Sequence, residues 1–169
     1  MRLRFALGLG LLLLACTNAP AQEYKPVVET RSRDALRGVE AVRVFVETTP
    51  LAEQHGASAA RLEAGATERL RKAGLRVLTG EEAKSATGGP IFFIRIKLFD
   101  ISNSYSFTTD VQLRETVRLT RPPATEIMAA TWQNAAHGLL SPRDTERVLD
   151  GMLSVVDFFV REYQAANGR

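Results

Sequence analysis

The chain has little of several residue types on which protein chemistry often depends. Its 169 residues include one cysteine, one tryptophan and two histidines. One cysteine cannot form an internal disulfide, and one thiolate is too few for the zinc and iron–sulfur sites that cysteines build. Hydrophobic residues make up 45% of the chain, which is too many for an intrinsically disordered protein. We therefore expect an ordinary folded domain that is stabilised by its own core.

Long hydrophobic runs are absent from the sequence after its first segment. Arg2 and Arg4 precede an apolar run at residues 5–15, and together they form the charged and hydrophobic regions of a secretory signal. A transmembrane helix needs roughly 20 apolar residues, so this run is too short to span a bilayer. The later apolar stretches, 91–101 and 148–160, are interrupted by charged residues. The mature protein is therefore expected to have no transmembrane span.

Two cleavage sites compete at the end of this segment. Residues 13–16 (LLAC) resemble a bacterial lipobox, which would make residues 1–15 the signal and Cys16 a lipidated N-terminus. Residues 19–21 (APA) instead give the small-x-small pattern of an ordinary signal peptidase site, which would remove residues 1–21. Both alternatives predict export to the periplasm. The protein would be either soluble there or anchored to the outer membrane through Cys16.

The charge balance of the mature chain is nearly even. Either cleavage removes Arg2 and Arg4, which lowers the formal net charge from +3 to +1. Nucleic-acid-binding proteins usually carry a basic surplus on one face. We therefore expect no nucleic-acid partner.

The mature chain divides into a lead-in and one domain. Residues 22–38 are polar and mixed, without sustained periodicity, and predict a tether or irregular lead-in. Residues 39–169 are expected to form a single α+β domain. Its first strand, 39–47, alternates Val42, Val44 and Val46 on one face.

The middle of the chain predicts a helix, a short strand and a three-stranded meander. Residues 58–73 place apolar side chains at helical spacing, with Ser58 as the N-cap, and residues 75–78 form the short strand. The first strand of the meander begins at Ile91, the second runs from 105 to 121, and the third runs from 127 to about 136. We expect paired residue numbers in the first hairpin to sum to about 207, which sets Lys97 opposite Asp110. In the third strand, the inward side chains are expected to be Met128, Ala130 and Trp132.

The last helix is expected to open at Ser141, with Pro142 at its first position. A wide apolar stripe between Val148 and Tyr163 should then pack on the sheet. The resulting order is β-α-β-β-β-β-α. These patterns predict an α+β two-layer sandwich with a mostly antiparallel sheet and both main helices on one face.

The sequence contains no recognisable catalytic, cofactor or metal motif. Neither His55 nor His137 has a partner at metal-ligand spacing. A Gly-x-Ser-x-Gly elbow is missing, and Gly88 and Gly89 precede a strand rather than a helix. We therefore predict a non-enzymatic protein without a cofactor.

One candidate binding surface comes from strand alternation. Arg95, Lys97, Arg114 and Arg118 should project from adjacent strands on the side away from the helices, beside aromatic and threonine side chains. A mixed cationic and aromatic face could dock a polyanion or a protein. A solvated sheet face has the same composition, so both interpretations stay open.

The layout resembles small exported bacterial proteins and lipoproteins of unassigned role. The similarity is carried by the signal or lipobox, the string LRKAGLRVL at residues 70–78, Thr131-Trp132 in the meander, and Asp157-Phe158-Phe159 in the final helix. The strand–helix–meander plan is similar to α+β domains of envelope lipoproteins of the curli-secretion and penicillin-binding-protein-activator types. This resemblance implies a binding or assembly role with an envelope protein partner, and carries no catalytic residues across. The alternative is a small-ligand carrier or hydrolase whose site forms only in three dimensions.

Overall fold

The computed structural model describes residues 33–86, 89–144 and 147–168. The predicted signal, Cys16 and most of the predicted lead-in lie outside these residues. The elements in chain order are β1 (Ala41–Glu47), α2 (Pro50–Gln54), α3 (Ala59–Lys72), β2 (Arg76–Val77), α4 (Gly80–Ser85), β3 (Ile91–Asp100), β4 (Tyr105–Arg118), β5 (Glu126–Leu140) and α5 (Arg147–Asn167).

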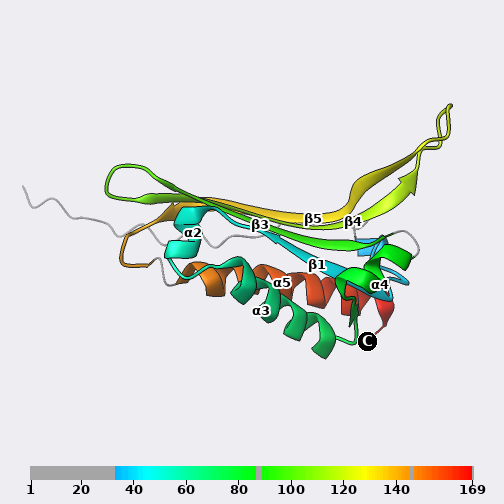
Figure 1. Cartoon of the computed structure of the whole chain (residues 1–169), viewed down its shortest axis with the longest axis horizontal. Helices are drawn as coiled ribbons and strands as arrows, with labels where there is room; N and C mark the ends of the chain where they lie inside the picture. The colour runs from blue at the N-terminus through cyan, green and yellow to red at the C-terminus, as the bar shows by residue number, and fades with distance from the viewer. Residues whose placement is uncertain (1–32, 87–88, 145–146, 169) are drawn as a thin grey trace, which may run out of the picture.

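Five strands form one open sheet in the order β2-β1-β3-β4-β5. The long strands β3, β4 and β5 pair antiparallel, whereas β1 runs parallel to both β2 and β3. Figure 1 shows α3 and α5 side by side beneath one face of the sheet. The predicted α+β two-layer sandwich with both main helices on one face is therefore confirmed. The parallel pairs make the sheet mixed. Helices lie in the chain between β1 and each of its two partners, and such a crossover connection lets two neighbouring strands run in the same direction.

Local sequence signals set the ends of the helices. The Ser58 side chain accepts a hydrogen bond from the Arg61 N–H at the start of α3, as expected of an N-cap. Thr79 and Glu82 form a capping box at the start of α4. The Thr79 backbone N–H and the Arg76 guanidinium donate to the Glu82 carboxylate, which lowers its pKa to about 2.

The β3–β4 hairpin differs from the predicted register by one pair. Ile91 lies opposite Arg114, so Arg95 faces Asp110, whereas Lys97 faces Thr108. The predicted pairing of Lys97 with Asp110 is wrong, although each side chain lies on its predicted face. A shift of two residues preserves both faces, so alternation alone cannot choose between these registers.

The β4–β5 pair contains a bulge that the sequence analysis missed. Leu113 pairs with Trp132 but Arg114 pairs with Ala130, which leaves Thr131 as the extra residue. An extra residue exchanges the two faces of the strand beyond it. Trp132 is buried, as predicted, whereas the inward placement of Met128 and Ala130 is wrong: Met128 is 49% exposed, and Ala130 lies opposite the outward Arg114. The strand also continues to Leu140, past its predicted end.

The predicted helix start at Ser141 is wrong as well. Residues 141–144 form a turn in which Ser141 accepts hydrogen bonds from the backbone N–H groups of Arg143 and Asp144. A serine followed by proline suits such a turn as well as a helix start. Because β5 runs to Leu140, the chain must first reverse before α5 can pack beneath the sheet.

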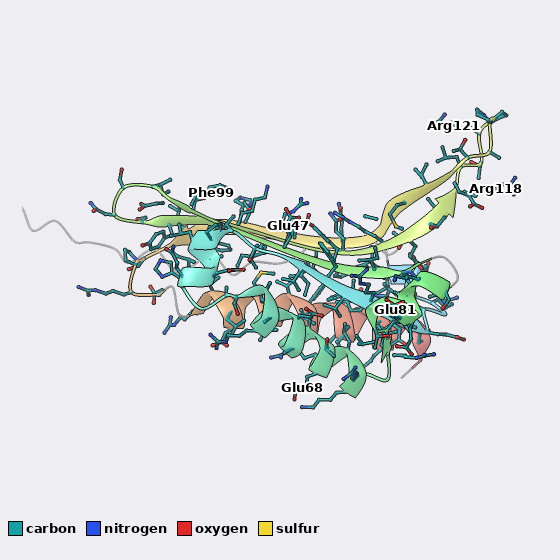
Figure 2. The ribbon with its side chains drawn as sticks, in the orientation of Figure 1. Glu47, Glu68, Glu81, Phe99, Arg118 and Arg121 are labelled. Carbon is teal, nitrogen blue, oxygen red and sulfur yellow. The ribbon has the colours of Figure 1, made fainter. Side chains whose placement is uncertain are left out.

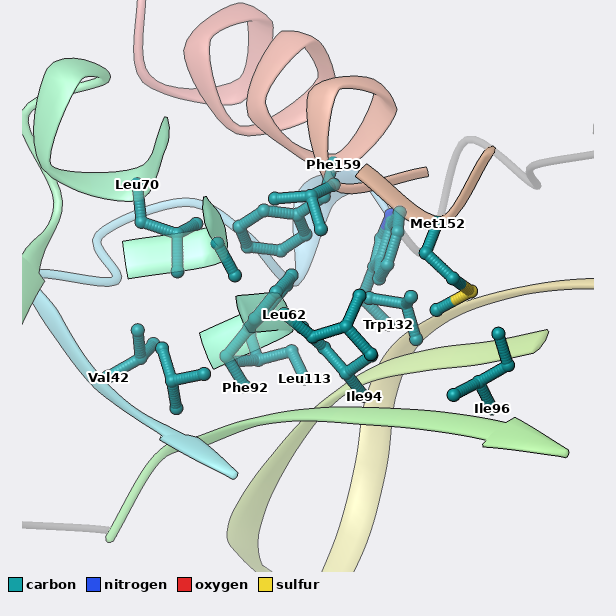
Figure 3. Close-up of a cluster of buried hydrophobic side chains, with 14 of the residues drawn as sticks. Val42, Leu62, Leu70, Phe92, Ile94, Ile96, Leu113, Trp132, Met152 and Phe159 are labelled. Carbon is teal, nitrogen blue, oxygen red and sulfur yellow. The ribbon is translucent and has the colours of Figure 1, made fainter. Parts of the chain in front are cut away.

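The core lies between the helices and the sheet (Figure 3). Phe159 of α5 is central to it: its ring lies 4.6 Å from the Phe92 ring and 4.9 Å from the Trp132 ring, measured between centroids. Leu62 and Leu70 of α3 are fully buried in the same cluster. The apolar stripes predicted for both helices therefore face the sheet.

The packed body extends into the predicted lead-in. Leu36 is fully buried, and Arg33 makes a two-point ion pair with Glu162 of α5 at 2.6 and 2.8 Å. This hydrogen-bonded pairing raises the pKa of Arg33. The Asn167 side chain donates to the Leu36 carbonyl and accepts from the Gly38 N–H. Residues 33–38 are thus fastened to the end of α5.

Two helix glycines provide a matched test of the space around them. A Cβ at Gly151 would meet nothing within 4 Å, whereas one at Gly65 would lie 2.8 Å from a Leu153 methyl between α3 and α5. Alanine is favoured over glycine inside a helix by about 1 kcal/mol. We expect Gly151→Ala to raise the free energy of unfolding by ~0.5–1 kcal/mol in urea denaturation. Gly65→Ala should give a smaller gain or a loss, and an equal gain at both positions would contradict the close approach at Gly65.

Candidate functional site

The sheet face opposite α3 and α5, which we call the outer face, carries the predicted binding residues. In-register pairing places Phe45 of β1 beside Phe93 of β3, and Phe93 opposite Gln112 of β4. Arg95 and Arg114 project from the same face, because residues two apart on a strand share a face. Figure 1 shows no described helix packed over this side of the long strands.

Phe93 is the centre of a compact cluster on the outer face. The Arg114 guanidinium carbon lies 3.6 Å from the centroid of the Phe93 ring, and that of Arg95 lies 4.9 Å away. The Phe45 ring stacks beside it at 5.9 Å, with 11° between the planes. These contacts leave Phe93 only 3% exposed, although no described helix covers it. We call Phe45, Phe93, Arg95 and Arg114 the Phe93 cluster.

Hydrogen bonds hold both arginines against the aromatic rings. Arg114 donates from Nε to the Gln112 side-chain oxygen at 2.6 Å. Gln112 in turn donates to the Asp110 carboxylate at 2.9 Å. Arg95 donates to the Glu47 carboxylate at 3.0 Å. A guanidinium fixed in this way presents its remaining N–H groups in a defined direction.

A shallow hollow of about 400 Å³ lies next to the Phe93 cluster. It is lined by Arg95, Lys97, Thr108, Thr109, Asp110, Gln112, Gln133, Ala135, Ala136 and His137. No carboxylate in the described part of the chain forms an ion pair with Lys97. The hollow therefore offers hydrogen-bond donors and a cation to a bound group.

The structure brings together three of the four predicted site residues. Arg95 and Lys97 line the hollow, and Arg114 is held by Gln112 at its border. Arg118 lies four residues beyond the last β3–β4 pair, on the projecting part of the β4–β5 hairpin. Figure 2 shows it near Arg121, far along the molecule from Glu47, the partner of Arg95. Arg118 is exposed and does not belong to the Phe93 cluster.

Sequence reasoning missed two members of this surface. Phe45 alternates with the buried Val44 and the partly buried Val46, and this pattern was sufficient to place it outward. The role of Gln112, which connects Arg114 to Asp110, had no signal in the sequence because it depends on side-chain conformations.

The histidines do not assemble a reactive site in the described residues. His55 ends α2 and packs its ring 4.8 Å from that of Tyr105. His137 lies on β5 opposite Thr108. Across residues 33–86, 89–144 and 147–168, no three His, Cys, Asp or Glu side chains are grouped closely enough to hold a metal ion. The geometry of the outer face is suited to binding through charge, hydrogen bonds and aromatic contact.

No protein-family model matches the chain, and no curated protein matches it at a significant level.

Proposed function

We propose that this chain is an exported, non-catalytic protein of the bacterial cell envelope that binds or assembles with another envelope protein on the periplasmic side. The secretory-signal pattern at residues 1–21 supports export. The observation that carries the binding role is the Phe93 cluster beside the hollow that contains Lys97. None of the described helices is long and apolar enough to cross a membrane.

The chemistry of the outer face favours an acidic partner segment that carries an apolar side chain. Around the hollow, the three cations Arg95, Lys97 and Arg114 outnumber the two carboxylates, Asp110 and the Glu47 that binds Arg95. A carboxylate of the partner can pair with Lys97, while an apolar group can pack on Phe45, which is 46% exposed. Because the arginines are already ordered on the Phe93 ring, binding them costs less side-chain entropy.

Charge reversal at Lys97 tests this surface. We expect Lys97→Glu to weaken the partner contact about tenfold, equivalent to ~1.4 kcal/mol, because it places a negative charge in the hollow. The contact can be measured in cells by a photo-crosslinking amino acid at the exposed outer-face residue Thr108, with Glu63 on α3 as the control site. A discrete protein adduct at Thr108 should be present with Lys97→Arg and reduced with Lys97→Glu. Identical adducts at both sites, or no response to charge reversal, would contradict the proposal.

Export is tested separately with a C-terminal alkaline phosphatase fusion, since this enzyme is active only after export. The full chain should give phosphatase activity, and removal of residues 1–21 should abolish it. Cys16→Ala then distinguishes the two cleavage alternatives: it moves a lipoprotein out of the membrane fraction and changes its intact mass, but leaves a peptidase-cleaved protein in the same fraction. An inactive full-length fusion would contradict export.

A further inference from the structure

A second cavity lies on the opposite side of the sheet from the Phe93 cluster. It has a volume of about 240 Å³ and is formed between α5 and the inner face of β4 and β5. Its apolar walls are Phe107, Ala136, Leu140, Val148, Met152 and Val155. Arg147 and His137 are the basic residues among the described ones that border it, and His137 lies opposite the outward Thr108, so its side chain belongs to the outer face. Apolar walls with a few polar groups are typical of small-molecule sites.

Gly151 is the feature of this cavity that packing does not explain. It lies inside α5, where glycine is less favourable than alanine. A Cβ at this position would meet nothing within 4 Å, so no neighbour requires the absence of a side chain. At Gly65, by contrast, Leu153 fills the space. Gly151 is exposed and is one of the residues that line the cavity, so this part of its border carries no side chain.

Among the described residues that line the cavity, Arg147 carries a positive charge, and Thr109 and Ser154 add hydroxyl groups. The Arg147 side chain is 81% exposed, and its ion pair with Asp144 is long, at 3.6 Å. A guanidinium held this loosely can exchange Asp144 for an anionic group of a ligand. Among the described residues, Asp144 and Asp150 do not line the cavity.

We propose that this cavity binds a short, single hydrocarbon chain that ends in an anionic group, with the chain against Phe107 and Met152 and the anion at Arg147. An apolar cavity of about 150 Å³ can hold benzene, so one of about 240 Å³ has room for a somewhat larger hydrocarbon group. A medium-chain carboxylate has this size and charge. The inference goes beyond the proposed protein-binding role, and it assigns a ligand class to a separate surface.

The test is a titration of the full mature protein with three defined probes: octanoate, 1-octanol and acetate. Methyl NMR signals of Val148, Met152 and Val155 report occupation of the cavity. Octanoate should shift these signals saturably, 1-octanol should bind about tenfold more weakly, and acetate should not shift them. Equal binding of acetate, or shifts confined to other methyl groups, would overturn the proposal.

Two variants and one control connect binding to the cavity. Gly151→Leu should weaken octanoate binding about tenfold by occupying the space, whereas Gly151→Ala should stay within a few-fold of the wild type. Arg147→Gln should reduce the affinity for octanoate to that for 1-octanol. Circular dichroism and thermal melting establish that each variant is folded. Unchanged octanoate affinity in folded Gly151→Leu would overturn the site.

The same anionic chain could come from a free fatty acid or from a lipid. A parallel titration with lysophosphatidylglycerol below its micelle concentration distinguishes these sources. Saturable shifts of the same methyl groups with octanoate alone identify free acids, and shifts with both probes identify a site that accepts lipid acyl chains. Binding of neither probe would overturn the proposal. None of these results depends on Lys97, so failure here is distinguishable from failure of the protein-binding role.

Discussion

Replacement of Trp132 by alanine should lower the free energy of unfolding by about 3–5 kcal/mol, the usual range for a buried aromatic residue. Trp132 is 1% exposed, and its ring meets Phe159 edge-on at 4.9 Å. Its loss would leave a cavity where β5 and α5 meet. Urea denaturation followed by circular dichroism measures the change. Total stabilities of only about 5–15 kcal/mol are usual, so this variant should be only marginally folded.

Trp132→Phe is the matched control for this substitution. The Trp132 Nε1 is buried and has no hydrogen-bond partner among the described residues. A phenylalanine therefore removes some ring contact but no hydrogen bond, and it relieves an unpaired buried N–H. We expect it to cost well under half as much as alanine. Equal losses for the two variants would show that Nε1 contributes a hydrogen bond in solution.

Replacement of Leu36 by alanine should lower the free energy of unfolding by about 2–5 kcal/mol. Leu36 is fully buried, and its carbonyl accepts a hydrogen bond from Asn167 near the end of α5. A side chain in a flexible tether would contribute almost nothing. The same urea denaturation therefore shows whether Leu36 is part of the core or belongs to a flexible lead-in.

Arg37→Ala is the control for Leu36, because Arg37 lies next to it in the chain but its side chain is 72% exposed. Its only ion pair in the described part of the chain is a surface contact with Asp34 at 3.4 Å, and such contacts contribute little. We expect a change within about 0.5 kcal/mol. A Leu36→Ala variant as stable as Arg37→Ala would mean that residues 33–38 are not packed in solution.

The two proposed binding surfaces share strands β4 and β5. His137, Thr109 and Ala136 line both the outer hollow and the cavity beneath the sheet. Each strand separates two environments of different chemistry: charged and aromatic outside, apolar inside. A ligand in the cavity would contact the same strands that carry the partner surface.

The candidate site was predictable in its composition but not in its arrangement. Alternation was sufficient to place Arg95, Lys97 and Arg114 on one face, since the period of a strand is two residues. It could not show that Arg114 stacks on Phe93 or that Arg118 lies apart, because those facts depend on where β3 ends. The cavity at Gly151 had no sequence signal, since it arises between α5 and strands distant in the chain.

The sequence by itself determined the five strands, the two main helices and the side of the sheet on which those helices lie, because apolar spacing of two or of three to four residues follows from backbone geometry. It did not indicate the short helix α2 or the turn that precedes α5. It also determined the lack of a cysteine-based site in the body of the protein. Only the tertiary structure decided the hairpin register, since a two-residue shift leaves the pattern of faces unchanged. It alone decided the bulge at Thr131, which turned Met128 outward, and the packing of Leu36 on α5. These features depend on contacts between segments far apart in the chain, which no local pattern records.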